Sequence, residues 1–239
     1  MRSCPAPSSR STSAPCDTTH ERSPACSAAP WPYPSALTTH FATADSDAAF
    51  AEAQLDRFLR LTEPFAARYA RHAANSAAAL VIPAARLDAA RCGIALYGID
   101  PLGENAAQFD LRPALRWDSE LALVKRLRAG ESTGYGRRFV AEEDAWVGIV
   151  PVGYADGFRR DMTGAEVMVG EERVRVVGTV SMDALAVLLP DRRRAGTPVT
   201  LVGDGITLEQ HAAVAGTIGY ELACGIRTAP GRAERTVVE

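Results

Sequence analysis

The stretch Pro151-Val152-Gly153-Tyr154-Ala155-Asp156-Gly157-Phe158-Arg159-Arg160 follows an apolar run, residues 146–150, that predicts a buried strand. Glycines on both sides of Tyr154 are typical of a tight turn that brings the backbone close to another group. We therefore expect Tyr154 at the exit of a strand, where a rigid support aims its phenol. Taken alone, the segment also fits an ordinary core tyrosine beside a turn.

The composition of the 239-residue chain sets broad limits on its function. This length suits one large domain or two modest ones. A net charge of -3 predicts no special attraction to nucleic acid or to an anionic membrane surface. No apolar run approaches the length needed to span a bilayer. Of the 26 basic residues, only Lys125 is a lysine, which becomes important below.

Residues 1–34 differ in composition from the rest of the chain. They are rich in Ser, Pro, Ala, Thr and Cys and poor in branched aliphatic residues, which predicts a disordered tail. An alternative is a misread start, in which upstream bases are translated out of frame. The segment lacks the apolar stretch of a signal peptide, and its three cysteines have no metal-binding spacing, so we predict no metal site there.

Residues 35–100 alternate between expected strands and helices. A short buried strand over 36–42 precedes a helix that Asp45 or Ser46 caps and that Pro64 ends. His72-Ala73-Ala74-Asn75-Ser76 comes next as the middle strand segment, followed by a short helix to Ile82 and an apolar strand over 91–96. This rhythm is typical of βα units and a parallel sheet, and three strands cannot close a barrel. We therefore expect the end of a barrel. The first helix should bury the apolar residues that recur at near-helical spacing, which are Phe50, Leu55, Phe58 and Leu61.

Residues 101–239 change to a β pattern. Strands are expected over 115–124, 146–152 (the central strand), 184–189 and 198–202, with a hairpin over 167–180 that turns at Gly170 and Glu171. One short helix follows a capping box at Thr207-Leu208-Glu209-Gln210. The fold class predicted for the whole chain is thus α/β plus all-β, the second part being a mostly antiparallel β domain.

Candidate binding residues lie at the ends of the late βα units. Asn75 and Ser76 follow a strand and open a helix, where backbone N–H groups favour an anion. Gly93 lets a ligand approach the next strand closely, and the last two βα units are the usual phosphate site of (β/α)₈ barrels. Arg91 enters an apolar strand, which is costly unless its guanidinium finds acceptors. Each residue singly also fits a structural role, as a helix cap or a packing glycine.

Six segments together resemble the alanine racemase family, in order and spacing. They are His40-Phe41-Ala42-Thr43-Ala44-Asp45, His72-Ala73-Ala74-Asn75-Ser76-Ala77-Ala78, Arg91-Cys92-Gly93-Ile94-Ala95-Leu96-Tyr97-Gly98, Gly153-Tyr154-Ala155-Asp156-Gly157, Ser181-Met182-Asp183 after Gly178, and Gly219-Tyr220-Glu221 with Cys224. That family pairs a barrel that binds pyridoxal 5'-phosphate with a C-terminal β domain and works as a head-to-tail homodimer. The resemblance implies that residues 35–100 are the last βα units of the barrel and residues 101–239 the β domain. It also implies cytoplasmic interconversion of L-alanine and D-alanine for peptidoglycan precursors.

The resemblance assigns roles to single residues. Tyr154 matches the catalytic tyrosine that removes or returns the α-proton in the partner subunit's site. Arg91 matches the arginine at the pyridine nitrogen, and Met182 matches the backbone donor to the substrate carboxylate. The residues matching phosphate contacts are Ser76, Gly93, Ile94 and Tyr220, while His40 and Asn75 match residues beneath the ring.

One catalytic group of the family has no match. The second base is the lysine that holds the cofactor as a Schiff base, and it lies on the barrel's first strand, upstream of anything printed here. Lys125 matches no catalytic position and is expected to be a solvated lysine at a strand edge. Two hypotheses therefore stand. The chain is an alanine racemase whose recorded sequence is short by its N-terminal half, or it is a non-catalytic fragment from a frameshifted or mis-started gene.

Overall fold

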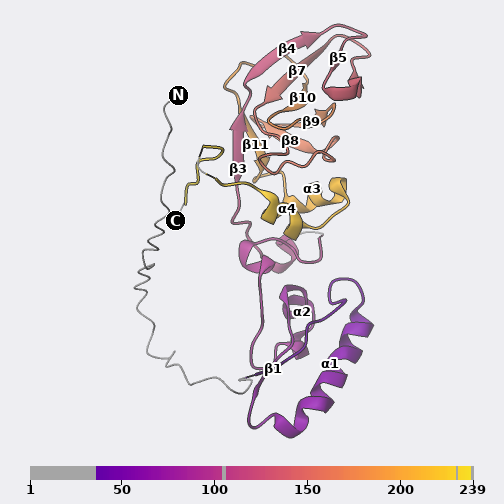
Figure 1. The fold of residues 1–239 in the computed structure, drawn as a ribbon, viewed down its shortest axis with the longest axis vertical. Coiled ribbons are helices and arrows are strands. Elements are labelled where there is room, and N and C mark those ends of the chain that lie inside the picture. The colour runs from indigo at the N-terminus through magenta and orange to yellow at the C-terminus, as the bar shows by residue number, and fades with distance from the viewer. Residues whose placement is uncertain (1–35, 104–105, 230, 238–239) are drawn as a thin grey trace, which may run out of the picture. The chain divides into compact units, whose positions relative to one another are not determined.

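The computed structural model describes residues 36–103, 106–229 and 231–237, which belong to one unit of the chain (Figure 1). The prediction of a disordered tail over residues 1–34 lies outside these residues. The boundaries 35–100 and 101–239 stay predictions. The α/β part contains β1 (Ala36–Thr38), α1 (Ala48–Thr62), η1 (Glu63–Phe65), β2 (Ala70–His72), α2 (Ser76–Val81), η2 (Pro83–Ala85), η3 (Ile94–Tyr97) and η4 (Ala106–Phe109).

The N-cap of helix α1 follows both of the residues predicted to cap it. Asp47, not Asp45 or Ser46, is the N-cap, and its side chain accepts a hydrogen bond from Phe50 N. The helix ends at Thr62, just before Pro64, as predicted.

The buried face of α1 is only partly the predicted one. The residues that it buries are Ala51, Leu55, Phe58 and Thr62. Phe50 and Leu61 are 54% and 66% exposed, so their predicted burial is wrong. The buried stripe follows the i, i+4, i+7 spacing from Ala51, and both large side chains fall off it.

The parallel sheet is smaller than predicted. β1 and β2 pair in parallel, from Ala36 with Ala70 to Thr38 with His72. The expected third strand, residues 91–96, is wrong, because only a single parallel bridge joins Asn75 and Arg91. Gly93 (φ −119°, ψ −84°) leaves the extended conformation, and the chain enters η3 directly after it.

The β domain is one antiparallel sheet with a small hairpin beside it (Figure 1). Its hydrogen-bonded order is β3-β11-β8-β9-β10-β7-β4, and each pair in it is antiparallel, as expected. The central position expected for the strand at residues 146–152 is wrong, since β7 lies next to the edge strand β4. An apolar run indicates that a strand is buried but not where it lies in the sheet. The strands are β3 (Trp117–Glu120), β4 (Leu123–Leu127), β7 (Ala145–Val150), β8 (Glu166–Val169), β9 (Glu172–Val177), β10 (Leu185–Leu189) and β11 (Pro198–Val202), and the hairpin is β5 (Ser132–Thr133) with β6 (Phe139–Val140).

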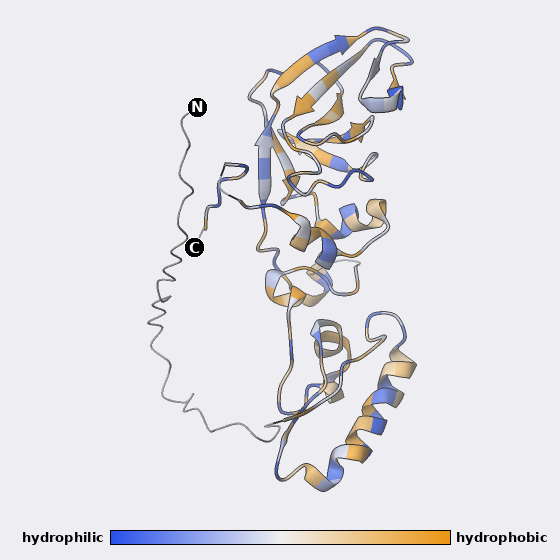
Figure 2. Cartoon of the chain, viewed as in Figure 1, coloured by the Kyte–Doolittle hydropathy of each residue, from blue (hydrophilic) through white to orange (hydrophobic). Residues whose placement is uncertain are grey.

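Apolar side chains cover both faces of this sheet, and Figure 2 shows hydrophobic colour on several of its strands, whereas β3 is largely hydrophilic. The main core includes Val150, Val187 and Leu201 and also Leu208 and Leu222 from the two C-terminal helices. A second cluster, which includes Ala141 and residues of β4, β7, β9 and β10, packs against Phe139. Burial on both faces is why β7 and β10 are nearly continuous apolar runs.

Two helices follow the sheet, and the sequence predicted one of them. The capping box at Thr207 and Gln210 is present at the start of α3 (Leu208–Ala215). The second, α4 (Gly219–Gly225), lacks a side-chain cap and was not predicted. Within the described residues, no helix is long and apolar enough to cross a membrane.

Candidate functional site

Arg91 is the most heavily bonded side chain of the candidate site. Its Nη1 donates to Thr38 Oγ1 (3.0 Å) and to the carbonyl of His72 (3.1 Å), and its Nη2 donates to the carbonyl of Thr39 (2.8 Å). The same nitrogens lie 2.6 Å from His72 Nδ1 and 3.2 Å from His40 Nδ1. The expectation that this arginine needs acceptors is therefore met by backbone and side-chain atoms around the ends of β1 and β2.

The contacts of Arg91 also set the tautomers of two histidines. A guanidinium has donors only, so the Nδ1 atoms of His40 and His72 must accept and their protons lie on Nε2. No described residue accepts a hydrogen bond from Arg91 Nε. That N–H is left to meet a ligand, and a planar ring with an acceptor nitrogen fits it chemically.

Ser76 and Gly93 form a small polar cradle. Ser76 is buried at the start of α2, where the Asn75 side chain caps the helix by accepting from Ala78 N at 2.9 Å. Ser76 Oγ accepts from Gly93 N (3.0 Å) and from Ala95 N (3.4 Å). A Cβ built on Gly93 meets no atom within 4 Å, so the space beside this amide is open to a ligand. Ile94, the next residue, is buried and begins η3.

Tyr220 closes this cradle from the C-terminal helix α4. Burial raises the pKa of its phenol, the nearby Asp45 carboxylate adds to the rise, and a hydrogen bond with the Ser76 side chain opposes it. Tyr220 and Ser76, separated by 144 positions in the sequence, are thus brought together. Tyr220 remains a protonated donor at neutral pH.

Tyr154 lies on the turn after β7, and its side chain is 42% exposed. Its N–H donates to the carbonyl of Ser181 (3.0 Å), and Ala155 N donates to the carbonyl of Met182 (3.0 Å). A Cβ on Gly153 would lie 2.3 Å from both of those carbonyl oxygens, so only glycine lets the two segments approach. The phenol is therefore presented to solvent on a turn that is held from both sides.

Met182 lies beside this turn, with its side chain half exposed. No described residue accepts a hydrogen bond from its backbone N–H, which leaves this amide able to bind an anionic group. Among the described residues, no hydrogen bond joins Tyr154 or Met182 to Arg91 or Ser76. The structure thus brings the predicted site residues together in two groups.

Lys125 is remote from both groups in its contacts. It lies on the edge strand β4, opposite Val147 of β7, and its side chain is partly exposed. The predicted strand-edge lysine is confirmed, although the strand is Leu123–Leu127 rather than one ending at Lys125.

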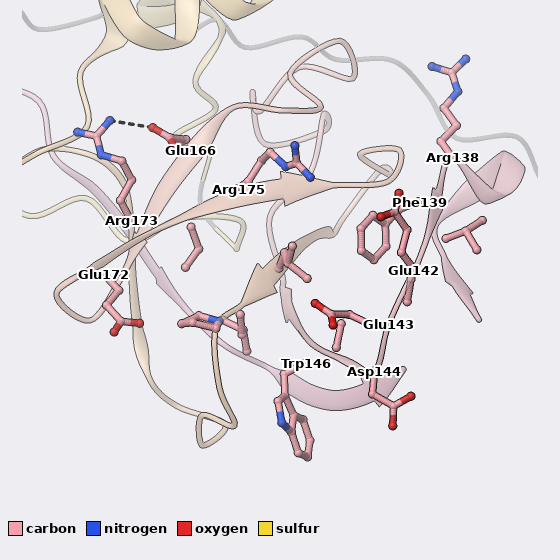
Figure 3. Close-up of a pocket in the computed structure, with 17 residues that line it drawn as sticks. Arg138, Phe139, Glu142, Glu143, Asp144, Trp146, Glu166, Glu172, Arg173 and Arg175 are labelled. Carbon is pink, nitrogen blue, oxygen red and sulfur yellow. Dashed lines mark hydrogen bonds and ion pairs between the residues drawn. The ribbon is translucent and has the colours of Figure 1, made fainter. Parts of the chain in front are cut away.

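A cavity of about 960 Å³ lies elsewhere on the β domain (Figure 3). It contains none of the predicted site residues. Four of its eight charged side chains form ion pairs, for example Arg173 with Glu166 at 2.9 Å. Over residues 36–103, 106–229 and 231–237, no group of three or more His, Cys, Asp or Glu side chains is arranged to hold a metal ion.

Sequence reasoning missed three parts of this arrangement: the hydrogen bonds of Thr38 and His72 to Arg91, the approach of Asp45 to Tyr220, and the bond between Arg232 and Asp156. His72 lies in one of the six segments that resemble the family, and this was the only signal in the sequence for a role near Arg91. Arg232 lies beyond the last recognised segment, and its partner became visible only in the fold.

Two family sequence models match this chain. The model described as "Alanine racemase, N-terminal domain" matches residues 21–101, and "Alanine racemase, C-terminal domain" matches residues 114–235. The chain belongs to the alanine racemase family. The predicted fold class, an α/β part followed by an antiparallel β domain, is thereby confirmed.

Individual alanine racemases agree with this assignment. The chain is 44% identical to the alanine racemase of Lactiplantibacillus plantarum over 198 residues, which is 80% of this chain and 52% of that protein. The crystal structure of alanine racemase from E. faecalis superposes with a TM-score of 0.75 at 40% identity, over 81% of this chain and 54% of that one. The biosynthetic enzyme of Pseudomonas aeruginosa gives 0.75 at 42% identity, over 80% and 55%. The chain thus spans about half the length of the relatives it matches.

Proposed function

We propose that this chain contributes to a pyridoxal 5'-phosphate-dependent interconversion of L-alanine and D-alanine, acting in a homodimer in the cytoplasm. The observation that carries the proposal is the Arg91 cluster, in which both Nη atoms are bonded to protein acceptors and Nε–H is left over. Such a fixed guanidinium suits a neutral ring nitrogen, because it donates a hydrogen bond without transferring its proton.

The residues present fit the cofactor. Ser76 Oγ, the backbone around Gly93 and Ile94, and the Tyr220 phenol surround open space suited to a phosphate. Asn75 and His40 would lie beneath the ring, where they keep the neighbouring helix start and Arg91 in place. When bound, the cofactor supplies an electron sink for the carbon that bears the amino group.

The chain's own residues divide the remaining work. Tyr154 would take or return a proton at the α-carbon from one face, since its phenol is exposed on a held turn. The Met182 amide would bind the substrate carboxylate. The two groups share no hydrogen bond within the described residues, which supports a site that combines one subunit's Arg91 cluster with the partner's Tyr154.

The second candidate is a chain that does not catalyse racemisation by itself. The specific observation that favours it is Lys125, the single lysine of the sequence, which lies on edge strand β4 and not beside Arg91. A base facing Tyr154 would then have to come from another subunit. In that case this chain contributes Tyr154 to a partner's site.

A complementation experiment tests both candidates. The chain is co-refolded with the L. plantarum relative in which the tyrosine equivalent to Tyr154 is replaced by phenylalanine, and D-alanine formation is measured by chiral chromatography. We expect activity to be restored at least tenfold above the altered relative, since general acid–base groups contribute about 10²–10⁴-fold. Tyr154→Phe in this chain is the matched control and should restore nothing.

Two results would count against the proposal. Equal activity with and without Tyr154 would remove its role as the proton-transferring group. Turnover by the chain alone, with a pyridoxyl group on Lys125 after borohydride reduction and peptide mapping, would show that Lys125 is the missing base.

A further inference from the structure

We propose that Arg232 is a positioning residue that fixes the Tyr154 turn by clamping the carboxylates of Asp156 and Asp183 together. The catalytic importance of that turn rests on the function proposed above, whereas the clamp itself is a physical property of the fold. Arg232 lies in the C-terminal segment after α4, far along the chain from the turn that it contacts.

The clamp is built on one nitrogen atom. Arg232 Nη1 donates to Asp156 Oδ1 at 2.8 Å and to Asp183 Oδ1 at 3.1 Å. Because the two carboxylates share this nitrogen, they are held close to each other despite their like charges. Without the guanidinium their repulsion would push the two loops apart. Both partners raise the pKa of Arg232, Asp156 more strongly than Asp183.

Asp156 uses its other oxygen to shape the turn. Asp156 Oδ2 accepts from Gly153 N at 2.9 Å, so a single carboxylate closes the turn around Tyr154 and receives the arginine. Its side chain is only 13% exposed, which strengthens both bonds relative to a surface pair. Its backbone carbonyl accepts from Arg227 N at 2.8 Å, a second tie to the C-terminal segment.

The second carboxylate, Asp183, belongs to the loop on the other side of Tyr154. It follows Met182, whose carbonyl accepts from Ala155 N, and Ser181, whose carbonyl accepts from Tyr154 N. Arg232 therefore bonds both to the turn that contains Tyr154 and to the loop whose carbonyls accept hydrogen bonds from that turn. The turn also packs closely against the end of α4, because a Cβ on Gly157 would lie 2.5 Å from the carbonyl oxygen of Gly225.

Backbone hydrogen exchange on the full chain tests the clamp. In Arg232→Gln, exchange at the amides of Gly153, Tyr154 and Ala155 should speed up by about tenfold, the scale of a lost charge-assisted hydrogen bond. Amides of β7 and β10 should stay within about twofold of the parent chain, which separates positioning from general stability. Arg232→Lys keeps a charged donor and should restore most of the protection.

The matched control is Arg193→Gln, which removes another arginine that forms ion pairs with two carboxylates, Glu172 and Asp191, on the same domain. It should leave the three turn amides unchanged. If Arg232→Gln does not fold, Asp183→Asn removes one partner at an exposed position and should raise exchange at Tyr154 and Ala155 by a few fold.

Two outcomes overturn the inference. The first is unchanged exchange at the three turn amides in Arg232→Gln or, where that variant does not fold, in Asp183→Asn. The second is a rise of the same size throughout the sheet. The measurement needs neither cofactor nor substrate. A positive result together with failed complementation therefore shows that the clamp exists and that the proposed function is wrong.

Discussion

Replacing Gly153 should destabilise the fold, because the turn has no room for a single added Cβ atom. Alanine there would place its Cβ 2.3 Å from the carbonyl oxygens of Ser181 and Met182, so the two segments must separate. We expect Gly153→Ala to lower the free energy of unfolding by about 2 kcal/mol, the usual scale of overpacking. Gly225→Ala is the control, since its Cβ meets nothing within 4 Å, and urea unfolding measures both variants. Equal stability of the two variants would contradict this reading of the turn.

For single residues, the sequence predicted what a residue requires better than it predicted which residues it contacts. The tight turn at Gly153 and the need of Arg91 for acceptors follow from conformational freedom and charge, which are properties of one residue. The acceptors themselves are not, because Thr38, His40 and His72 reach Arg91 only when β1 and β2 pair. Their contribution could not be derived from spacing.

Among the elements, helix α3 carries a buried histidine that should make the β domain sensitive to acid. His211 is 2% exposed, and its Nε2 donates to the carbonyl of Leu201 at 2.6 Å. Burial lowers the pKa of His211, and the bond to Leu201 opposes this only in part. The unfolded chain binds a proton near its ordinary pKa of 6.5 before the folded one does. Stability is therefore complete above that value and falls as the pH drops through the lowered pKa.

We expect the free energy of unfolding to fall by about 1 kcal/mol between about pH 7.5 and about pH 5.5, the linkage expected of one histidine. His211→Gln should remove most of this dependence, whereas the exposed His40→Gln should keep it. Urea unfolding at both pH values measures the effect. A wild-type slope in His211→Gln would assign the dependence to other groups.

Predictions of elements succeeded where a local signal was strong. The capping box of α3 and the turn at Gly170 between β8 and β9 were correct because side-chain bonds and a positive φ of 62° specify them locally. The strand expected over residues 91–96 was wrong, since a short apolar run fits a 3₁₀ helix as well as a strand. Helix α4 was missed because it has no capping side chain and is short.

For the whole molecule, the candidate phosphate cradle joins Ser76 and Gly93 to Tyr220, which only the complete path of the chain brings together. The resemblance to alanine racemase singled out these residues from the sequence, because they occur in motifs that follow the family's order. Hydrophobic periodicity does not indicate which distant residues come into contact. Which residues pair at the C-terminal end, such as Arg232 with Asp156, was visible only in three dimensions.

The most direct test of the central claim is hydrogen exchange across the chain with and without pyridoxal 5'-phosphate. It is performed on Lys125→Arg, so that no lysine side chain can react with the cofactor. We predict slower exchange at Gly93, Ile94 and Ala95 and in α4 around Tyr220, with β4 unchanged, because the phosphate would lie between the Ser76 cradle and the Tyr220 phenol. Protection confined to β4 or to the cavity of Figure 3, or none at residues 93–95, would contradict the account.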